Sequence, residues 1–389
     1  MQRASWFRSV APIVAAAIAL CLHASKPNPA VLAAESDTPA SAPTTWDRQA
    51  AARYMDSREV WWQAWDHDKR DHGTRCVSCH TQVPYALARP ALRSALGETS
   101  VSPMESAMLA DVEKRVRNWK DMLAFYSDEV YGTGKEIESR NAESVLNAII
   151  LSSYDRSQGR LGVLTQLAFD HAWGLQSKTG PDAGAWVWQD FEYTPWESKE
   201  SQYHWAALMA IATATAPDDY ASDPATATHL QALTHYLESH YEDQPLLNKV
   251  VALWASHWFP EIVSKPQREA LLNSIYALER PDGGWSLTDL GTWARRDKTP
   301  LETHPDGYAT ALITLVLEET VAGVPHADPQ SKAHIQRGIA WLIANQDKTT
   351  GAWPAWSLNK NRDPKSEVGQ FMSDAATGYA VLALDHPRK

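Results

Sequence analysis

The sequence predicts an all-α protein built from repeated helical hairpins. From about residue 107 onward, longer and shorter apolar segments alternate with the periodicity of an α-helix. The shorter segments, such as 145–151 and 308–315, are rich in alanine and leucine and poor in charge, which is typical of helices buried on all sides. The pairs recur every ~50–70 residues, and this spacing indicates stacked hairpins. No run of alternating apolar and polar residues predicts a β-strand.

Residues 1–33 have the composition of a secretory signal peptide. Two arginines precede an apolar run at 10–22 that is too short to span a bilayer, and 31–33 (Val-Leu-Ala) is an acceptable cleavage site. A cut after Ala24 and retention as a membrane anchor are the alternatives. We expect an exported, periplasmic protein with no stable membrane span after cleavage.

The charge of the mature chain limits its partners. Cleavage after Ala33 removes three basic and no acidic residues, so the formal net charge changes from −11 to −14. An acidic surface argues against nucleic acid and anionic membranes as partners, and it permits docking to a basic redox partner protein. Residues 34–45 are rich in proline, serine and threonine, which predicts a disordered linker.

The segment 46–106 contains the motif Cys76-Val-Ser-Cys79-His80. This C-x-x-C-H pattern is typical of c-type haem attachment. Two thiols at this spacing can add to two vinyl groups of a porphyrin, and the adjacent imidazole can ligate the iron. The chain has three cysteines, and one lies in the predicted signal peptide, so both remaining cysteines belong to the motif. We expect one covalent haem c held by Cys76, Cys79 and His80.

Other uses of this motif are less consistent with the sequence. A zinc site would need a second group of ligands, and a dithiol redox motif would be expected near a βαβ pattern; the sequence shows neither. The sixth iron ligand is open. We favour Met104 or Met108, and the alternatives are His67, His72 or an open coordination position.

The sequence around the motif predicts one regular and one irregular segment. A helix is expected at 50–65, and its last turns carry three tryptophans that pack either on the porphyrin or against the body of the protein. Downstream, Pro84 and Pro90 bracket a short turn, so 87–96 is expected to be at best one broken helix.

The repeated region predicts two sets of helices. The outer set is expected at 107–125, 161–176, 227–240, 266–279 and 330–345. The inner set is expected at 142–154, 201–213, 246–257, 307–319 and 375–384.

The connections between these helices share a glutamine, glycine and tryptophan signature. It is complete at 337–353 and degenerate at 173–186 and 278–285. The glycines permit the turn, the glutamine can bond free backbone groups at the helix end, and the tryptophan can cover that end. We assign this signature to stability and not to catalysis.

Residues 337–353 match the QW motif of the squalene–hopene cyclases and related terpenoid cyclases at every fixed position. This resemblance implies an α/α toroid of about five helical hairpins over 107–389. The motif at 76–80 predicts a helical haem-binding segment in front of it. The resemblance does not imply cyclase activity, because the family's Asp-x-Asp-Asp acid motif is absent. The segment most similar to that motif, 66–69 (Asp-His-Asp-Lys), lacks the last aspartate. The zinc-binding cysteine of protein prenyltransferases is also missing from the toroid.

In such a toroid the inner helices begin at one mouth, and polar and aromatic residues cluster in the sequence near those starts. Helix capping and core packing explain each residue taken singly. Together they could line an aromatic, weakly acidic pocket for an apolar or glycan small molecule, with the long connection 186–200 as its rim. The pocket residues expected are Trp186, Trp188, Trp196, Tyr203, His204, Trp205, Asp306 and Asp374.

Two functions follow from these patterns. The first is an exported single-haem c-type cytochrome that transfers electrons, with the toroid as a scaffold for a partner or an apolar ligand. The alternative is a haem-assisted enzyme that acts on a lipid, isoprenoid or glycan in the toroid cavity. A haem that serves as a structural pin is a third hypothesis. Whether the protein is an enzyme is left open, and the first function is our expectation.

Overall fold

The computed structural model describes residues 45–322 and 329–385. The predicted signal peptide at 1–33 and all of the predicted linker except Thr45 lie outside the described residues. The described residues belong to one compact unit. Its described helices include none that combines the length and the apolar character needed to cross a membrane.

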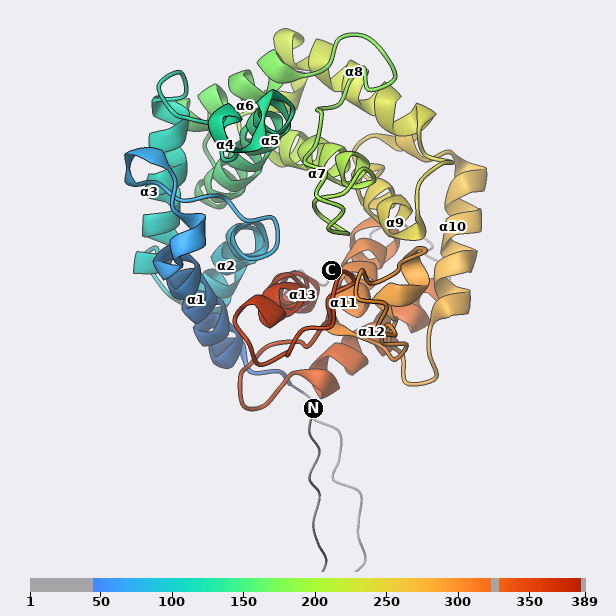
Figure 1. The fold of residues 1–389 in the computed structure, drawn as a ribbon. Helices are drawn as coiled ribbons and strands as arrows, with labels where there is room; N and C mark the ends of the chain where they lie inside the picture. The colour runs from blue at the N-terminus through green and yellow to red at the C-terminus, as the bar shows by residue number, and fades with distance from the viewer. Residues whose placement is uncertain (1–44, 323–328, 386–389) are drawn as a thin grey trace, which may run out of the picture. The chain divides into compact units, whose positions relative to one another are not determined.

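The described residues form two concentric rings of helices (Figure 1). The outer ring consists of α1 (Arg48–Ala64), α3 (Pro103–Arg117), α6 (Val163–Leu175), α8 (Pro224–Ser239), α10 (Lys265–Leu278) and α12 (Pro329–Asn345). The inner ring consists of α2 (Gln82–Leu96), α5 (Thr133–Gln158), α7 (Ser201–Thr215), α9 (Leu246–Ala255), α11 (Gly307–Leu317) and α13 (Phe371–Leu384). Each inner helix contacts the next, and α13 contacts α2, which closes the ring. The predicted α/α toroid is confirmed.

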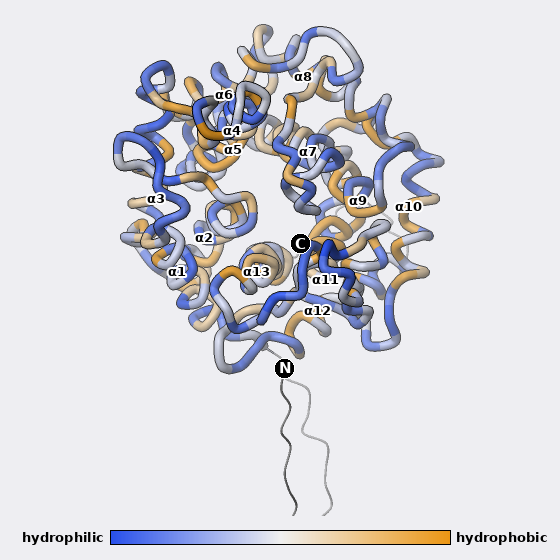
Figure 2. The backbone as a smooth tube through the Cα atoms, in the orientation of Figure 1, coloured by the Kyte–Doolittle hydropathy of each residue, from blue (hydrophilic) through white to orange (hydrophobic). Residues whose placement is uncertain are grey.

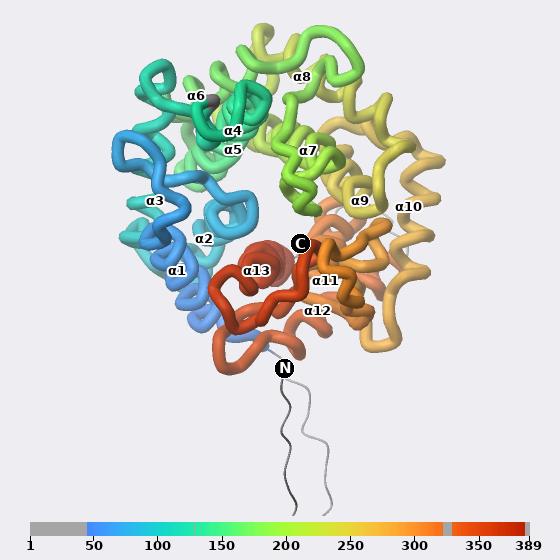
Figure 3. The backbone as a smooth tube through the Cα atoms, viewed as in Figure 1, coloured from blue at the N-terminus to red at the C-terminus, as the bar shows by residue number. Residues whose placement is uncertain are grey.

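The segment 46–106 supplies the first outer and inner pair of this toroid. Figure 3 shows the beginning of the described chain beside its end, and α2 lies between α13 and α5 in the inner ring. The ring therefore has six helix pairs in its described part, one more than the five expected from the repeats. The segment that carries the C-x-x-C-H motif is a structural member of the ring.

The helix α2 is continuous, although a broken helix was expected there because of Pro90. Proline cannot donate a backbone hydrogen bond, so the carbonyl of Ala86, one turn earlier, is left without its helical partner. The hydroxyl of Ser153 on α5 donates to that carbonyl at 3.0 Å. A neighbouring inner helix thus compensates for the proline, which the local sequence of α2 cannot indicate.

The glutamine and the tryptophan of the QW signature bond to backbone groups near the end of a helix, as the sequence predicted. Gln346, after α12, donates from Nε2 to the carbonyls of Gly351 and Asp47, at 2.9 Å each. The indole of Trp353 donates to the carbonyl of Leu342 near the end of the same helix at 2.7 Å. The glutamine therefore joins α12 to the start of α1, and the tryptophan satisfies a free helix carbonyl.

The two ends of the toroid differ in their connections. Four connections that enter inner helices are long, at 65–81, 176–200, 279–306 and 346–370, and we call this end the long-connection face. The inner helices end at the opposite, short-connection face. Figure 2 shows apolar residues on inner helices such as α11 and α13 and many hydrophilic residues on outer helices such as α3 and α10. Every residue of α11 is buried.

Candidate functional site

The C-x-x-C-H motif lies at the long-connection face, in the loop between α1 and α2. The amide of Cys76 donates to the carbonyl of Asp68 at 2.8 Å, and the indole of Trp62 donates to the carbonyl of Cys76 at 2.9 Å. Both cysteines are free thiols. Burial raises the pKa of Cys76 to about 11 and raises that of Cys79 well above its usual value, so both thiols are protonated at neutral pH.

The imidazole of His80 is surrounded by aromatic rings from three parts of the toroid. Phe371, at the start of α13, stacks on it with ring centroids 3.7 Å apart. Trp62 from α1 and Trp196 from the connection before α7 lie at 5.3 and 5.7 Å. Burial lowers the pKa of His80 to about 3, which keeps the imidazole neutral. We call these four residues the His80 cluster.

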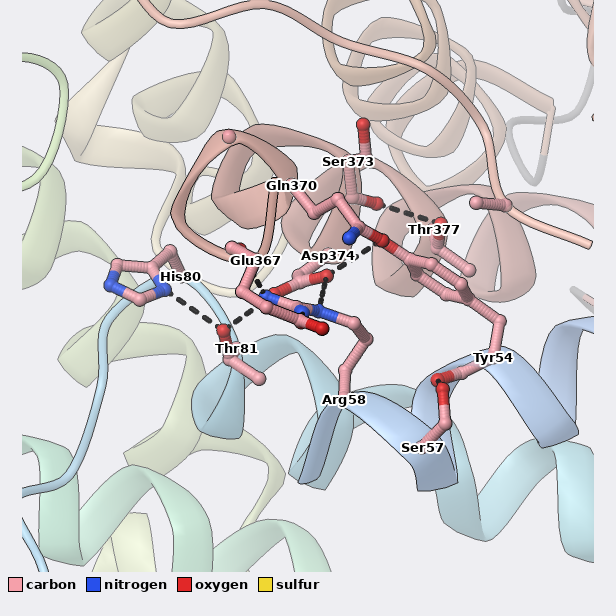
Figure 4. Close-up of polar contacts among 12 residues, drawn as sticks. Tyr54, Ser57, Arg58, His80, Thr81, Glu367, Gln370, Ser373, Asp374 and Thr377 are labelled. Atoms are coloured by element: carbon pink, nitrogen blue, oxygen red, sulfur yellow. Dashed lines mark hydrogen bonds and ion pairs between the residues drawn. The ribbon is translucent and has the colours of Figure 1, made fainter. Parts of the chain in front are cut away.

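A chain of hydrogen bonds leads from His80 to α13 (Figure 4). The Nδ1 atom of His80 lies 2.9 Å from the hydroxyl of Thr81, and that hydroxyl donates to Oδ2 of Asp374 at 2.7 Å. The other oxygen of Asp374 accepts from the hydroxyl of Tyr54 and from Nε of Arg58, each at 2.7 Å. Asp374 is buried, and its three donors hold it in one orientation.

A second set of polar side chains fixes the loop from the side of α1. Glu59 accepts through Oε1 from Gln63 at 2.7 Å and from Gln82 at 2.8 Å. Gln82 in turn accepts from the amide of Ser78, within the motif, at 3.3 Å. Burial raises the pKa of Glu59 to about 7. The loop is therefore held from both sides by side chains that local sequence motifs did not reveal.

Glu197 is a second carboxyl with a raised pKa near the motif. It follows Trp196 of the His80 cluster, and its charge acts on both cysteine thiols and on Tyr126. Burial raises its pKa to about 7. The described residues provide no hydrogen bond to its carboxylate. Sequence reasoning marked the connection 186–200 but not this residue, because a single glutamate in a loop carries no spacing signal.

Two of the expected pocket residues lie at the His80 cluster. Trp196 contacts the imidazole directly, and Asp374 is bonded to it through Thr81. Asp306 lies elsewhere: it caps α11, accepts from the amides of Ala309 and Leu287, and burial raises its pKa to about 6.

The other expected pocket residues are packed into the wall of the toroid. The indole of Trp186 donates to a carbonyl at the end of α6, and Tyr203 donates to the carbonyl of Leu237. Trp188 and Trp205 stack with ring centroids 5.2 Å apart. His204 is fully buried, and burial lowers its pKa to about 4. A binding role for these residues stays a prediction.

The proposed sixth iron ligands lie on α3. Met108 is buried in the core, and Met104 is partly buried against it. Figure 1 places α3 in the outer ring, whereas His80 lies in the loop just before the inner helix α2. The rings in contact with the imidazole are those of Trp62, Trp196 and Phe371. Ligation by either methionine also stays a prediction. No group of three or more metal-ligating side chains occurs among the described residues.

A cavity of about 1270 Å³ lies at the opposite end of the toroid, toward the short-connection face. Its wall combines aliphatic side chains with polar and charged ones, and it comes from the later turns of the inner helices and from α12. The wall includes Leu87, Ile149, Leu208, Leu315 and Leu382. None of the site residues expected from the sequence lines this cavity.

Comparisons with known proteins support the fold. No family model and no curated protein matches this chain. A solved structure of unsaturated glucuronyl hydrolase from Streptococcus agalactiae is similar over 89% of this chain and 93% of its own, with 9% identity and a TM-score of 0.53. A UGL structure with the saccharide dGlcA-Glc-Rha-Glc is similar over 88% of this chain and 97% of its own, with 12% identity and a TM-score of 0.50. At these identities the similarity shows a shared toroid fold.

The expectation of an electron-transfer cytochrome with the toroid as its scaffold is wrong. The fold shared with glucuronyl hydrolase covers 89% of the chain, and α2, which follows the motif, is an inner helix of the ring. The segment is therefore not a cytochrome module attached to a separate scaffold. The expectation of a redox partner protein depended on that function and has no support.

Proposed function

We propose that this protein is an enzyme that acts on a carbohydrate at the long-connection face of its toroid. The observation that carries the proposal is the carboxyl of Glu197, which is half-buried, has no hydrogen-bond partner among the described residues and lies beside the His80 cluster. A carboxyl with a pKa of about 7 is partly protonated near neutral pH and can serve as a general acid.

Aromatic rings near this carboxyl suit a sugar substrate. Trp61 and Trp65 stack with ring centroids 5.1 Å apart, and both lie about 6 Å from the ring of Phe371. These three side chains are half-buried, so part of each ring is exposed to a ligand. Flat, partly exposed rings of this kind can stack on the apolar face of a sugar, while their neighbours supply a few directed polar groups.

The reaction we propose is acid-assisted cleavage of a glycosidic bond. Glu197 donates its proton to the oxygen of the leaving sugar, and water adds to the sugar carbon from which that oxygen departs. The added water then loses a proton to solvent, and Glu197 takes one up again for the next turnover. The carbohydrate substrates of the two structural neighbours agree with this class of reaction, although their similarity to this chain is one of fold.

The test is activity of the mature protein on a panel of oligosaccharides, including unsaturated uronides, with products identified by chromatography and mass spectrometry. We expect Glu197→Gln to lower kcat/KM by about 10²-fold or more, because the amide cannot donate the proton. Activity should also fall as the pH rises above about 7, where Glu197 loses its proton. Glu192→Gln is the matched control, since that side chain lies in the same connection and is 83% exposed. Absence of turnover on every saccharide, or full activity of Glu197→Gln, would overturn the proposal.

A second candidate function is binding of an apolar small molecule in the cavity at the short-connection face. The leucine and isoleucine side chains of the wall favour it, because they can bury an aliphatic chain, and the charged residues of the same wall, such as Arg93 and Arg156, can contact a polar head group. Native mass spectrometry with hexadecanol as the probe should detect one or more bound molecules. Ala212→Trp, within the wall, should abolish binding, and Val163→Trp, on the exposed surface, should not. Equal binding by both variants would contradict this assignment.

We also propose that the protein is exported and that its signal peptide is removed. The support is the charge and apolar pattern of residues 1–33. Mass spectrometry of the N-terminus after expression in a bacterial host with a periplasm should find the chain starting after Ala33 or Ala24. Accumulation of the intact chain in the cytoplasm would contradict the proposal.

A further inference from the structure

We propose that Cys76, Cys79 and His80 hold a covalently attached haem, with Nε2 of His80 as the ligand that binds its iron. This proposal does not depend on the proposed carbohydrate activity, although the two sites share Phe371 and the long-connection face. It rests on the spacing of the three residues, on the two free thiols and on the hydrogen-bond chain behind the imidazole.

The thiols are positioned for attachment. The backbone of Cys76 is held by one bond through its amide and another through its carbonyl, and Ser78 between the cysteines accepts from the amides of Thr81 and Gln82 at 3.2 and 2.9 Å. Both thiols are therefore carried by a fixed loop. Attachment adds each S–H across one vinyl group of the haem: a C–S bond forms, the hydrogen goes to the other vinyl carbon, and nothing is oxidised or released.

The hydrogen-bond network determines which nitrogen of His80 carries the proton. Asp374 accepts from Tyr54 and Arg58 on one oxygen and from Thr81 on the other, so the hydroxyl hydrogen of Thr81 points to the carboxylate. The oxygen of Thr81 can then meet Nδ1 of His80 only as an acceptor. The proton of the neutral imidazole lies on Nδ1, and the lone pair lies on Nε2.

This tautomer is the one that a metal ligand requires. Ligating histidines donate their second ring N–H to an oxygen, which fixes the ring orientation and raises the basicity of the ligating nitrogen. Here Thr81 accepts from the ring, and Asp374, Arg58 and Tyr54 hold Thr81 in place (Figure 4). Phe371 covers one face of the imidazole, and the described residues offer no hydrogen bond to Nε2. We therefore assign Thr81 and Asp374 as positioning residues for His80.

The composition of the surroundings also fits a porphyrin. The rings of Trp62, Trp196 and Phe371 form an apolar environment around the imidazole. A bound haem would supply redox-active, Lewis-acidic iron at the long-connection face. The protein's own contribution is to fix the thiols, to orient the imidazole and to limit the access of water.

The first experiment expresses the full chain in a bacterial periplasm together with a cytochrome-maturation system. We expect the mature mass to increase by one haem and the absorption band to survive acid–acetone extraction. Cys76→Ser or Cys79→Ser should leave one thioether and shift the pyridine haemochrome band. The bare polypeptide mass in a folded, unmodified chain would overturn the proposal, whatever the result with oligosaccharides.

The second experiment tests the positioning residues in the haem-loaded protein. Thr81→Val keeps the shape of the side chain but removes the acceptor, so the imidazole becomes less basic and the reduction potential should rise, with a lower Fe–N(His) stretching frequency. Thr81→Ser restores the hydroxyl and should restore both values. Circular dichroism establishes that each variant is folded. A Thr81→Val variant that is folded and has the wild-type potential and stretching frequency would overturn the assignment of Thr81.

Discussion

Replacing Glu59 by glutamine should change the free energy of unfolding in a pH-dependent way. The change should be more favourable at alkaline pH than at acidic pH. Glu59 is fully buried, and Oε2 of its carboxyl has no partner among the described residues. Burial raises its pKa from 4.5 to about 7, which corresponds to about 3 kcal/mol at 1.36 kcal/mol per pKa unit. The native state binds the proton more tightly than the unfolded state, so the stabilising effect of protonation is lost as the pH rises from 4.5 to 7.

The assay is urea unfolding of the wild type and of Glu59→Gln at pH 4.5 and at pH 8. The amide has no charge to bury, and any packing cost of the amide is the same at both pH values. The difference in free energy of unfolding, variant minus wild type, should therefore be greater at pH 8 by about 3 kcal/mol. The control is Glu105→Gln, which breaks a buried ion pair with Arg93 and should lower stability at both pH values. A Glu59→Gln difference that is independent of pH would refute the reasoning.

Two further predictions concern the closure of the ring. Gly351 has a φ of +85°, and a Cβ there would lie 2.4 Å from the backbone of Ala50. Gly351→Ala should therefore lower the free energy of unfolding, measured by urea titration, by about 2–4 kcal/mol. Gly174→Ala, where nothing lies within 4 Å, is the control and should be neutral or slightly stabilising. Ser153→Ala leaves the carbonyl of Ala86 unpaired and should cost about 1–3 kcal/mol in the same assay, and an unchanged stability would contradict our account of α2.

The helical repeats could be predicted from the sequence because their signal is local. The expected inner helix at 201–213 is observed as Ser201–Thr215, and the expected outer helix at 330–345 is observed as Pro329–Asn345. The helix α2 could not be predicted, because Pro90 breaks the local pattern and the residue that compensates for it, Ser153, is distant in sequence. Local patterns therefore identified the repeats and missed the helix whose continuity depends on a neighbour.

The sequence also predicted only part of the candidate site. The motif at 76–80 is contiguous, so its spacing could be interpreted directly. The link from Thr81 to Asp374 joins residues 293 positions apart, and no pattern in one sequence indicates such a pair. The role of Glu197 could not be predicted either, because its raised pKa comes from burial in the folded protein and not from neighbouring residues in the chain. Chemistry that depends on burial or on long-range pairing required the structure.

The placement of the motif follows from the asymmetry of the toroid. Inner helices begin at the long-connection face, where the connections have enough residues to bring side chains such as Trp196 and Glu197 over the ring. The motif enters the same face because α2 is an inner helix held between α5 and α13. Its positioning residue Asp374 belongs to α13, the last helix of the ring. The orientation of His80 therefore depends on closure of the whole toroid, and the segment 46–106 alone lacks the residue that orients its imidazole.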